Sequence, residues 1–114
     1  WARLSDGRVL LRQRPEKGLL GGMMEIPSTE WREKKWSPGE AAATAPITAK
    51  WRPLEGVIRH TFTHFHLELT VLTGEINNKE AHNSLWCLPS RFSEHALPTV
   101  MKKVAKHVTK HAAD

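Results

Sequence analysis

Residues 59–64 concentrate groups that could recognise another molecule. The stretch supplies basic hydrogen-bond donors, a hydroxyl that both donates and accepts, and an aromatic ring, at Arg59, His60, Phe62, Thr63 and His64. A strand needs only alternating apolar positions for stability, so this density of polar groups indicates a recognition edge. The alternative is that Phe62 belongs to the core and that both histidines lie on a strand surface.

Metal binding is not predicted for this stretch. His60, His64 and His66 resemble a ligand cluster by type, but zinc sites gather three or four ligands supported by further hydrogen bonds. No cysteine or carboxylate is spaced to complete such a site. The single cysteine, Cys87, excludes a disulfide within the chain and lies in an apolar run, so we expect it in the core.

No catalytic residue is predicted in this chain. Nucleophilic catalysis needs an activated side chain beside an oriented base, and neither Thr63 beside His64 nor Cys87 has a third, orienting residue. The glutamates are dispersed, without a close pair to hold Mg²⁺ or to divide acid and base roles. The seven between residues 16 and 68 are Glu16, Glu25, Glu30, Glu33, Glu40, Glu55 and Glu68.

The segment 14–31 is rich in glycine and apolar residues. Gly18, Gly21 and Gly22 allow positive φ, and their amides could approach a phosphate, with Arg14 and Lys17 as candidate phosphate contacts. We favour a tight structural turn, because no Gly-Lys-Ser/Thr run or strand-to-helix fingerprint accompanies these glycines.

Alternating apolar residues predict the strands that must position these groups. Residues 65–72 alternate with period two and predict a half-buried strand. Asp6-Gly7 between residues 1–4 and 8–14 predicts a hairpin that ends at Pro15. Further strands are expected at 51–60 and at 85–88, where Pro89 ends the run.

Helices and turns are expected in the remaining segments. Ser37-Pro38-Gly39 reads as a breaker in an exposed loop, and alanines predict a short helix at 40–45. Gly74 and residues 76–79 predict a turn. Ser90 is expected to cap a short turn through Glu94. Apolar residues between 97 and 108 recur at helical spacing and predict an amphipathic helix opened by Pro98. The lysines on its other face either contact nucleic acid or are simply solvated.

Length and charge limit what the chain can be. A chain of 114 residues supports one domain with one modest core. With 17 Lys and Arg against 12 Asp and Glu, the net charge of +5 favours an anionic partner, although it equally suits a solvated surface. There is no membrane span or signal peptide, so we expect a soluble protein in a reducing compartment, cytoplasmic or nucleoid-associated. Because the chain begins at Trp1 without methionine, we expect a fragment of a longer protein.

Four stretches together resemble a known family. They are GRVLLRQRPEKGLLGGMMEIPSTEW, RHTFTHFHLEL, LWCLP and ALPTVMKKV, and they look like the C-terminal domain of A/G-specific adenine DNA glycosylases. The resemblance spans essentially the whole chain. It implies one Nudix-like α/β (α+β) domain over residues 1–114, with a mixed β-sheet and flanking helices.

The resemblance also implies a function in base excision repair. In that family the domain inspects 8-oxoguanine opposite adenine in double-stranded DNA, and it follows a helical catalytic domain that bears an iron–sulfur cluster and removes the adenine. This chain lacks that N-terminal domain, so it is expected to carry no cofactor and to be inactive alone. The expected partners are DNA with 8-oxoguanine:adenine mispairs and the catalytic domain.

The family's Phe-Ser-His loop corresponds to Phe62, Thr63 and His64, with threonine where serine is usual. Its hydroxyl is retained and can address both the acceptor O8 and the donor N7 of 8-oxoguanine, while the added methyl group changes the space available. Phe62 could wedge beside the lesion, and His64 could donate to a phosphate or a base edge.

Two other functions stay open at this point. An active Nudix hydrolase needs an Arg-Glu-x-x-Glu-Glu run, and residues 39–44 read Gly-Glu-Ala-Ala-Ala-Thr, so diphosphate hydrolysis is expected to be absent. The other alternative is a protein-docking domain that makes no contact with the lesion.

Overall fold

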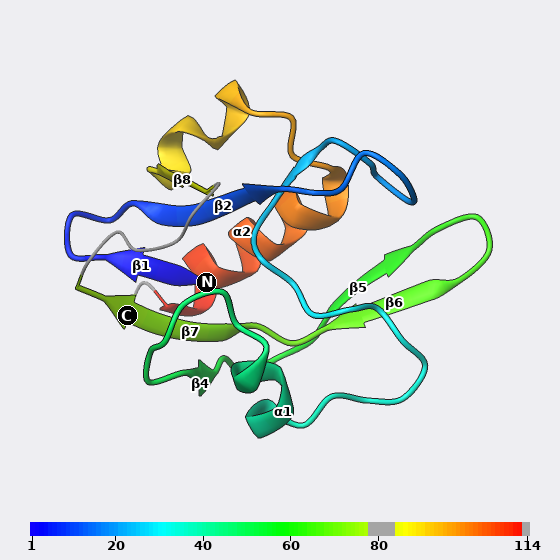
Figure 1. Ribbon diagram of the computed structural model, residues 1–114, viewed down its shortest axis with the longest axis horizontal. Helices are drawn as coiled ribbons and strands as arrows, with labels where there is room; N and C mark the ends of the chain where they lie inside the picture. The colour runs from blue at the N-terminus through cyan, green and yellow to red at the C-terminus, as the bar shows by residue number, and fades with distance from the viewer. Residues whose placement is uncertain (78–83, 113–114) are drawn as a thin grey trace.

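The main sheet is built around an N-terminal hairpin. In this computed structural model, which describes residues 1–77 and 84–112, β1 (Ala2–Leu4) and β2 (Val9–Gln13) pair antiparallel, with Arg3 opposite Val9 (Figure 1). The Gly7 amide donates to the Leu4 carbonyl at 2.9 Å, and Gly7 has a φ of 94°. This conformation is one that glycine adopts readily, so the predicted Asp-Gly turn is confirmed.

Within the described residues the main sheet has six strands. The order is β3-β2-β1-β7-β4, and β8 also pairs with β2. β1 and β7 are parallel, whereas the other pairs are antiparallel, so the sheet is mixed. The strands that join β1 and β2 in this sheet are β3 (Met24–Glu25), β4 (Arg52–Pro53), β7 (Leu72–Ile76) and β8 (Ser84–Cys87).

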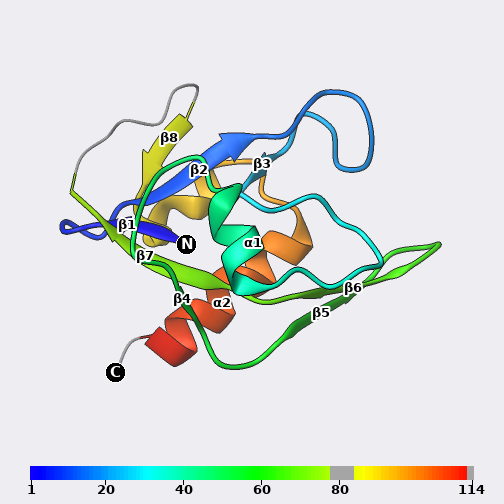
Figure 2. The ribbon, with the colours of Figure 1, turned by 60° about the horizontal axis from the view of Figure 1, so that its bottom comes forward.

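A second, two-stranded sheet leaves the main one. It is the hairpin of β5 (Ile58–Thr61) and β6 (His66–Leu69), which projects from the body of the domain (Figures 1 and 2). Its register places His60 opposite Leu67 and Thr61 opposite His66. Residues directly opposite one another share a face, so His60 and His66 lie on opposite faces of the hairpin.

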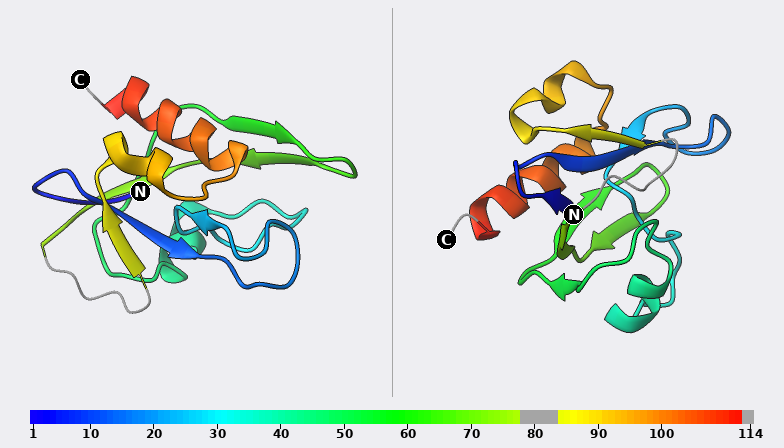
Figure 3. Two further views of the ribbon diagram at one scale, coloured as in Figure 1. Left: turned by 90° about the horizontal axis from the view of Figure 1, so that it is seen from above. Right: turned by 60° about the vertical axis from the view of Figure 1, so that its left-hand side comes forward.

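Helices cover both faces of the sheet (Figure 3). The amphipathic helix α2 (Thr99–Ala112) buries Val100, Met101, Val104 and Val108, which confirms the predicted terminal helix. Val9 and Leu11 of β2 join the cluster on the α2 side, whereas Leu10 joins a second cluster with Ile47 and Ile76. The side chains of Val9, Leu10 and Leu11 are fully buried, so β2 contributes to the centre of both clusters.

The short helix α1 (Pro38–Ala43) begins two residues earlier than predicted. Ser37 is its N-cap, because the Ser37 hydroxyl accepts from the Glu40 amide and the Glu40 carboxylate accepts from the Ser37 amide. Ser37-Pro38 therefore starts the helix instead of breaking the chain, since proline suits the first helical position. Ser90 also differs from expectation, because it lies inside the 3₁₀ helix η1 (Pro89–Glu94), whose N-cap is Leu88.

Two segments that were each predicted as one strand form parts of two strands, and these strands pair in different sheets. Residues 51–60 form β4, which pairs with β7, and the start of β5, which pairs with β6. Gly56, with a φ of 96°, turns the chain between them. Residues 65–72 likewise contribute to both β6 and β7. Periodicity did not reveal the second break, because the apolar alternation of residues 65–71 continues through it. Residues 51–60 have no strict alternation, and Gly56 was the available signal for the first break.

Gly74 is part of β7 and not of a turn, which corrects the prediction. A Cβ at Gly74 would stand 2.9 Å from Cε3 of Trp51, so the strand contains glycine because a tryptophan ring packs against its backbone. Ile76 ends β7, and residues 78 and 79 of the predicted turn lie outside the described residues.

The fold class expected from the sequence is confirmed as a single α+β domain with a mixed sheet and flanking helices. Among the described helices, none is both long enough and apolar enough to cross a membrane.

Substituting Gly56 with alanine is expected to lower the free energy of unfolding by about 1 kcal/mol or more, because alanine is strained at positive φ. The added Cβ would also lie 2.7 Å from Cε1 of His107 on α2. Urea denaturation would measure the change. Gly39→Ala is the control, since Gly39 has open space around it and sits in a helix. Equal stability of Gly56→Ala and the wild type would contradict this account of the turn.

Candidate functional site

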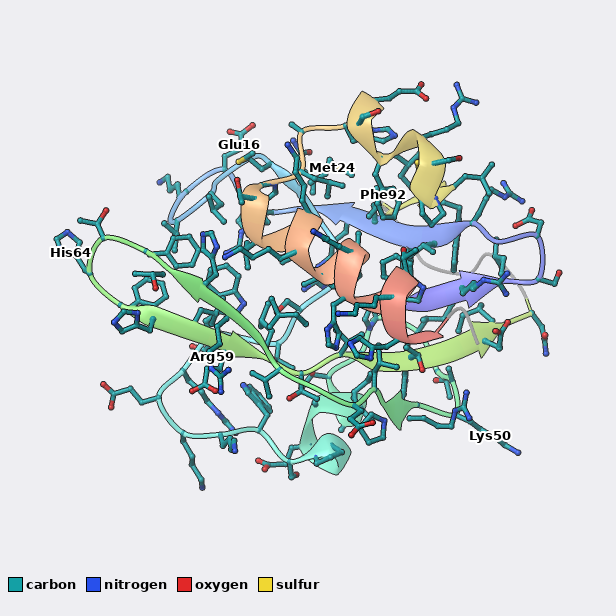
Figure 4. All side chains as sticks on the ribbon, turned by 180° about the vertical axis from the view of Figure 1, so that it is seen from behind. Glu16, Met24, Lys50, Arg59, His64 and Phe92 are labelled. Atoms are coloured by element: carbon teal, nitrogen blue, oxygen red, sulfur yellow. The ribbon has the colours of Figure 1, made fainter. Side chains whose placement is uncertain are left out.

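The predicted recognition residues lie at the end of the β5–β6 hairpin. The Phe62 amide donates to the Phe65 carbonyl at 2.8 Å, which closes a turn with Thr63 and His64 as its two exposed central residues. Neither adopts a positive φ, so the turn forms without the Gly or Asn that usually marks a hairpin. Figure 4 shows His64 at the outer end of the hairpin. The predicted loop therefore exists, and it presents Thr63 and His64 to solvent.

Phe62 faces the body of the domain. Its ring packs against the main core cluster, with its centroid 5.7 Å from the Trp31 ring and 4.7 Å from the His60 ring. The neighbouring ring of Phe65, 4.9 Å away, is instead 41% exposed. Phe65 is thus the more exposed aromatic ring at the end of the hairpin, whereas its sequence pattern predicts only the first residue of a strand.

The three histidines of this stretch do not converge. His66 faces outward, where its Nδ1 lies 2.9 Å from Oγ1 of Thr61. His60 faces inward, and its Nδ1 is buried without a hydrogen-bond partner. In residues 1–77 and 84–112, no group of three His, Cys, Asp or Glu side chains could hold a metal ion.

Arg59 lies on the outward face of β5. Its side chain is 77% exposed, and its Nε stands 3.8 Å from the Glu68 carboxylate. An exposed pair at this distance contributes little to stability and leaves the guanidinium accessible. The Arg59 carbonyl accepts from Nζ of Lys103 at 3.1 Å, which brings the lysine-bearing helix α2 beside the base of the hairpin.

The two candidate phosphate contacts differ in environment. Arg14 is largely occupied, because it donates to the Glu25 carboxylate at 2.8 Å and to the Leu19 carbonyl at 3.2 Å. Its guanidinium carbon also lies 4.6 Å from the centre of the Trp31 ring. Lys17 is exposed in the β2–β3 loop, which lies at the same end of the molecule as the β5–β6 hairpin (Figures 1 and 3).

The glycines of the β2–β3 loop are needed for its turn. Gly18 and Gly22 have positive φ, and the Gly22 amide donates to the Pro15 carbonyl at 3.1 Å. A Cβ on Gly21 would clash with the Glu16 carbonyl oxygen. These contacts support the structural turn that the sequence favoured over a phosphate-binding loop.

A buried ion-pair network joins β2 and β3, and the sequence interpretation did not include it. Glu25 is only 3% exposed and accepts from Arg12 at 2.9 Å as well as from Arg14. Arg12 also donates to the Ser28 carbonyl at 2.8 Å. The available signal was the Arg12-x-Arg14 spacing, because residues two apart on a strand share a face and can bind one carboxylate.

A cleft of about 520 Å³ lies between residues 27–36, α1 and strands β6 and β7. In it, the Arg32 guanidinium covers the Trp36 ring at 3.5 Å. The one carboxylate of α1 is Glu40. Hydrogen bonds from Ser37, followed by the nearby Arg32, hold the pKa of Glu40 below its usual range, so this carboxylate is ionised but committed to capping the helix.

Cys87 is a core residue, as predicted. Its side chain is buried in the main cluster, and its Sγ lies 3.3 Å from the Leu88 carbonyl oxygen. Burial raises the pKa of the Cys87 thiol, with a further contribution from Glu94, which keeps the group protonated and unreactive.

Comparison with known proteins supports the resemblance seen in the sequence. Human adenine DNA glycosylase is 29% identical over 108 residues, covering 85% of this chain. The chain spans about 20% of the length of that relative. The C-terminal domain of mouse MUTYH, solved in complex with human PCNA, has a TM-score of 0.71 and 24% identity, with 99% of this chain and 88% of that chain covered.

The fold is shared more widely. A MutT protein from Methanosarcina mazei Go1 has a TM-score of 0.77 at 15% identity, over 99% of this chain and 91% of that one. The NUDIX domain profile matches residues 1–107, which is nearly the whole chain. The predicted likeness to the Nudix-like C-terminal domain of adenine DNA glycosylases is thereby confirmed, and the chain belongs to the Nudix domain family.

Proposed function

We propose that this chain is the lesion-recognition domain of an adenine DNA glycosylase and that it reads 8-oxoguanine opposite a mispaired adenine. The observation that carries the proposal is the projecting turn that exposes Thr63 and His64 at the end of the β5–β6 hairpin. The similarity to human adenine DNA glycosylase supports the repair context. Excision would occur in an N-terminal catalytic domain with an iron–sulfur cluster, which we propose as the partner of this domain.

The chemistry of the turn suits the lesion. 8-Oxoguanine differs from guanine in having an acceptor at O8 and a donor at N7. The Thr63 hydroxyl can donate to the first and accept from the second, and it is exposed in the described structure. His64 can donate to a phosphate or to a base edge beside it. Recognition would thus depend on the turn and not on the histidine set.

Basic groups near the hairpin supply sequence-independent attraction to DNA. The Arg59 side chain and Lys17 are exposed, and the chain carries a net charge of +5. Such groups position a protein on the phosphate backbone without distinguishing bases. Arg14, which is held by Glu25, is better suited to supporting the hairpin through Trp31 than to gripping phosphate.

Two alternatives are less well supported. Nudix hydrolysis needs several carboxylates on the helix beside the cleft, and α1 supplies only Glu40, which caps its own helix. A docking domain without lesion contact is suggested by the mouse MUTYH domain, which was solved with PCNA. That role would give no reason for the recognition chemistry of the turn.

Thr63→Ala is expected to reduce the preference for an 8-oxoguanine:adenine duplex over a guanine:adenine duplex by roughly fivefold or more, because each base-specific contact contributes about 1 to 3 kcal/mol of discrimination. His64→Ala is expected to act in the same direction. Fluorescence anisotropy with both duplexes at low salt would measure the ratio of dissociation constants.

Thr48→Ala is the matched control for Thr63→Ala, because Thr48 is an exposed threonine outside the hairpin. Its discrimination ratio should equal that of the wild type. Unchanged discrimination in both hairpin variants would remove the turn from lesion recognition and would favour the docking function.

Lys17→Ala is expected to weaken binding to both duplexes equally and to reduce the slope of log affinity against log salt by about one, because a phosphate contact carries no base information. Lys50→Ala is the control, since Figure 4 places Lys50 far from His64 and at the opposite side of the view. A Lys17 variant that changes the duplex preference while leaving the salt slope intact would contradict the assignment.

The 114-residue chain is expected neither to release adenine from an 8-oxoguanine:adenine duplex nor to release phosphate or diphosphate from 8-oxo-dGTP with Mg²⁺. Alkaline strand cleavage and an assay for both phosphate products would test the two activities. Adenine release would place the excision chemistry in this chain, and nucleotide hydrolysis would favour the hydrolase alternative.

A further inference from the structure

A row of aromatic rings begins inside the domain and ends in solvent at the turn of the β5–β6 hairpin. The Trp31 and Phe62 ring centroids are 5.7 Å apart with an interplanar angle of 31°. The Phe62 and Phe65 centroids are 4.9 Å apart with an angle of 30°. Both distances fall in the range of favourable aromatic pairs, so each ring packs on the next.

The inner end of this row is held firmly. Arg14 covers the Trp31 ring at 4.6 Å and binds the buried Glu25 carboxylate. His60 contacts Phe62 edge-on, with the centroids 4.7 Å apart and the planes at 71°. Phe62 is therefore fixed from two sides, and it provides a rigid support for the ring of Phe65.

The outer end of the row is open. Phe65 is 41% exposed, which is unusual for a large apolar side chain. It directly follows His64 in the sequence. The turn hydrogen bond between Phe62 and Phe65 restricts the backbone that carries this ring. An aromatic surface that is already ordered loses little conformational entropy when a ligand stacks on it.

We propose that Phe65 stacks on a nucleobase of DNA, at the lesion or directly beside it, while Thr63 and His64 make the polar contacts. The inference rests on the proposed function and adds a base-contacting residue to it. Basic groups at this end of the molecule favour DNA as the occupant, because exposed Arg59 lies on the hairpin and exposed Lys17 lies in the β2–β3 loop (Figure 1). Aromatic rings take any base, since every base has a π face.

The competing explanation is that Phe65 only shields Phe62 from water. Phe65→Leu separates the two explanations, because leucine also shields an apolar neighbour but offers no aromatic face. Phe65→Tyr retains the ring and should retain stacking. Leu88→Ala is the control for loss of an exposed apolar side chain, since Leu88 is 39% exposed and follows β8, away from the hairpin.

The test measures binding of these variants and of Phe65→Ala to an 8-oxoguanine:adenine duplex by fluorescence anisotropy. A second duplex carries abasic analogues in place of the lesion and its two neighbours in the same strand. We expect Phe65→Ala and Phe65→Leu to weaken binding to the first duplex by about tenfold, as for loss of one stacked base. On the abasic duplex they should match the wild type, and Phe65→Tyr and Leu88→Ala should match it on both. Denaturation midpoints near that of the wild type would show that the variants are folded.

The possible outcomes separate this inference from the proposed function. If the wild type prefers the lesion duplex but Phe65→Leu binds as tightly as the wild type, the stacking role is wrong and the lesion-reading role stands. Equal losses on the base-bearing and abasic duplexes would also overturn stacking. If the wild type shows no preference for the lesion duplex, the proposed function fails and the inference fails with it.

Discussion

The ion pairs of the buried Glu25 carboxylate hold the aromatic support of the β5–β6 hairpin in place. Glu25 lies on β3 and binds Arg12 of β2 and Arg14, which follows β2, so one carboxylate joins the two strands. Removing a carboxylate from water is costly, and two guanidinium groups with good hydrogen-bond geometry offset that cost. Because Arg14 also covers Trp31, the same network sets the position of the ring that packs against Phe62.

The second constraint is that the chain changes its strand pairing where it enters and where it leaves the β5–β6 hairpin. β4 pairs with β7 in the main sheet, but the chain between them leaves that sheet and pairs only with itself as β5 and β6. Gly56 makes the exit by adopting a conformation that other residues rarely reach. The result is a hairpin whose base is buried by Ile58 and Leu67 while its turn stands in solvent.

The Nudix fold does not by itself imply Nudix hydrolysis. The sheet, the flanking helices and the cleft beside α1 are present, yet α1 contributes alanines where a hydrolase needs carboxylates. A fold can host several chemistries, and function has to be argued from the side chains of the site. Here the candidate side chains are concentrated on the hairpin turn, and their chemistry suits the hydrogen-bonding groups and aromatic faces of the proposed ligand better than a metal-bound phosphate.

Much of this protein was determined by local sequence. The Asp6-Gly7 turn, the alternation of Val9, Leu10 and Leu11 between two faces, and the apolar stripe of α2 all follow from short-range pattern, because each depends on residues a few positions apart. The resemblance of residues 62–64 to a known recognition loop predicted a turn between two strands, and the structure has that turn. The helix start at Ser37 was also readable from its N-cap and proline, although it was interpreted as a breaker.

Only the tertiary structure decided which strands pair and which aromatic ring of the hairpin stays exposed. Residues 65–71 keep their apolar alternation across one break, and residues 51–60 supply apolar residues without a strict period. The division of both segments between two sheets therefore depends on partners that are distant in sequence. Phe62 and Phe65 are the same residue type three positions apart, and they differ because Trp31 and the core cover one ring and leave the other 41% exposed. Burial of this kind is a property of packing between elements, and no local pattern specifies it.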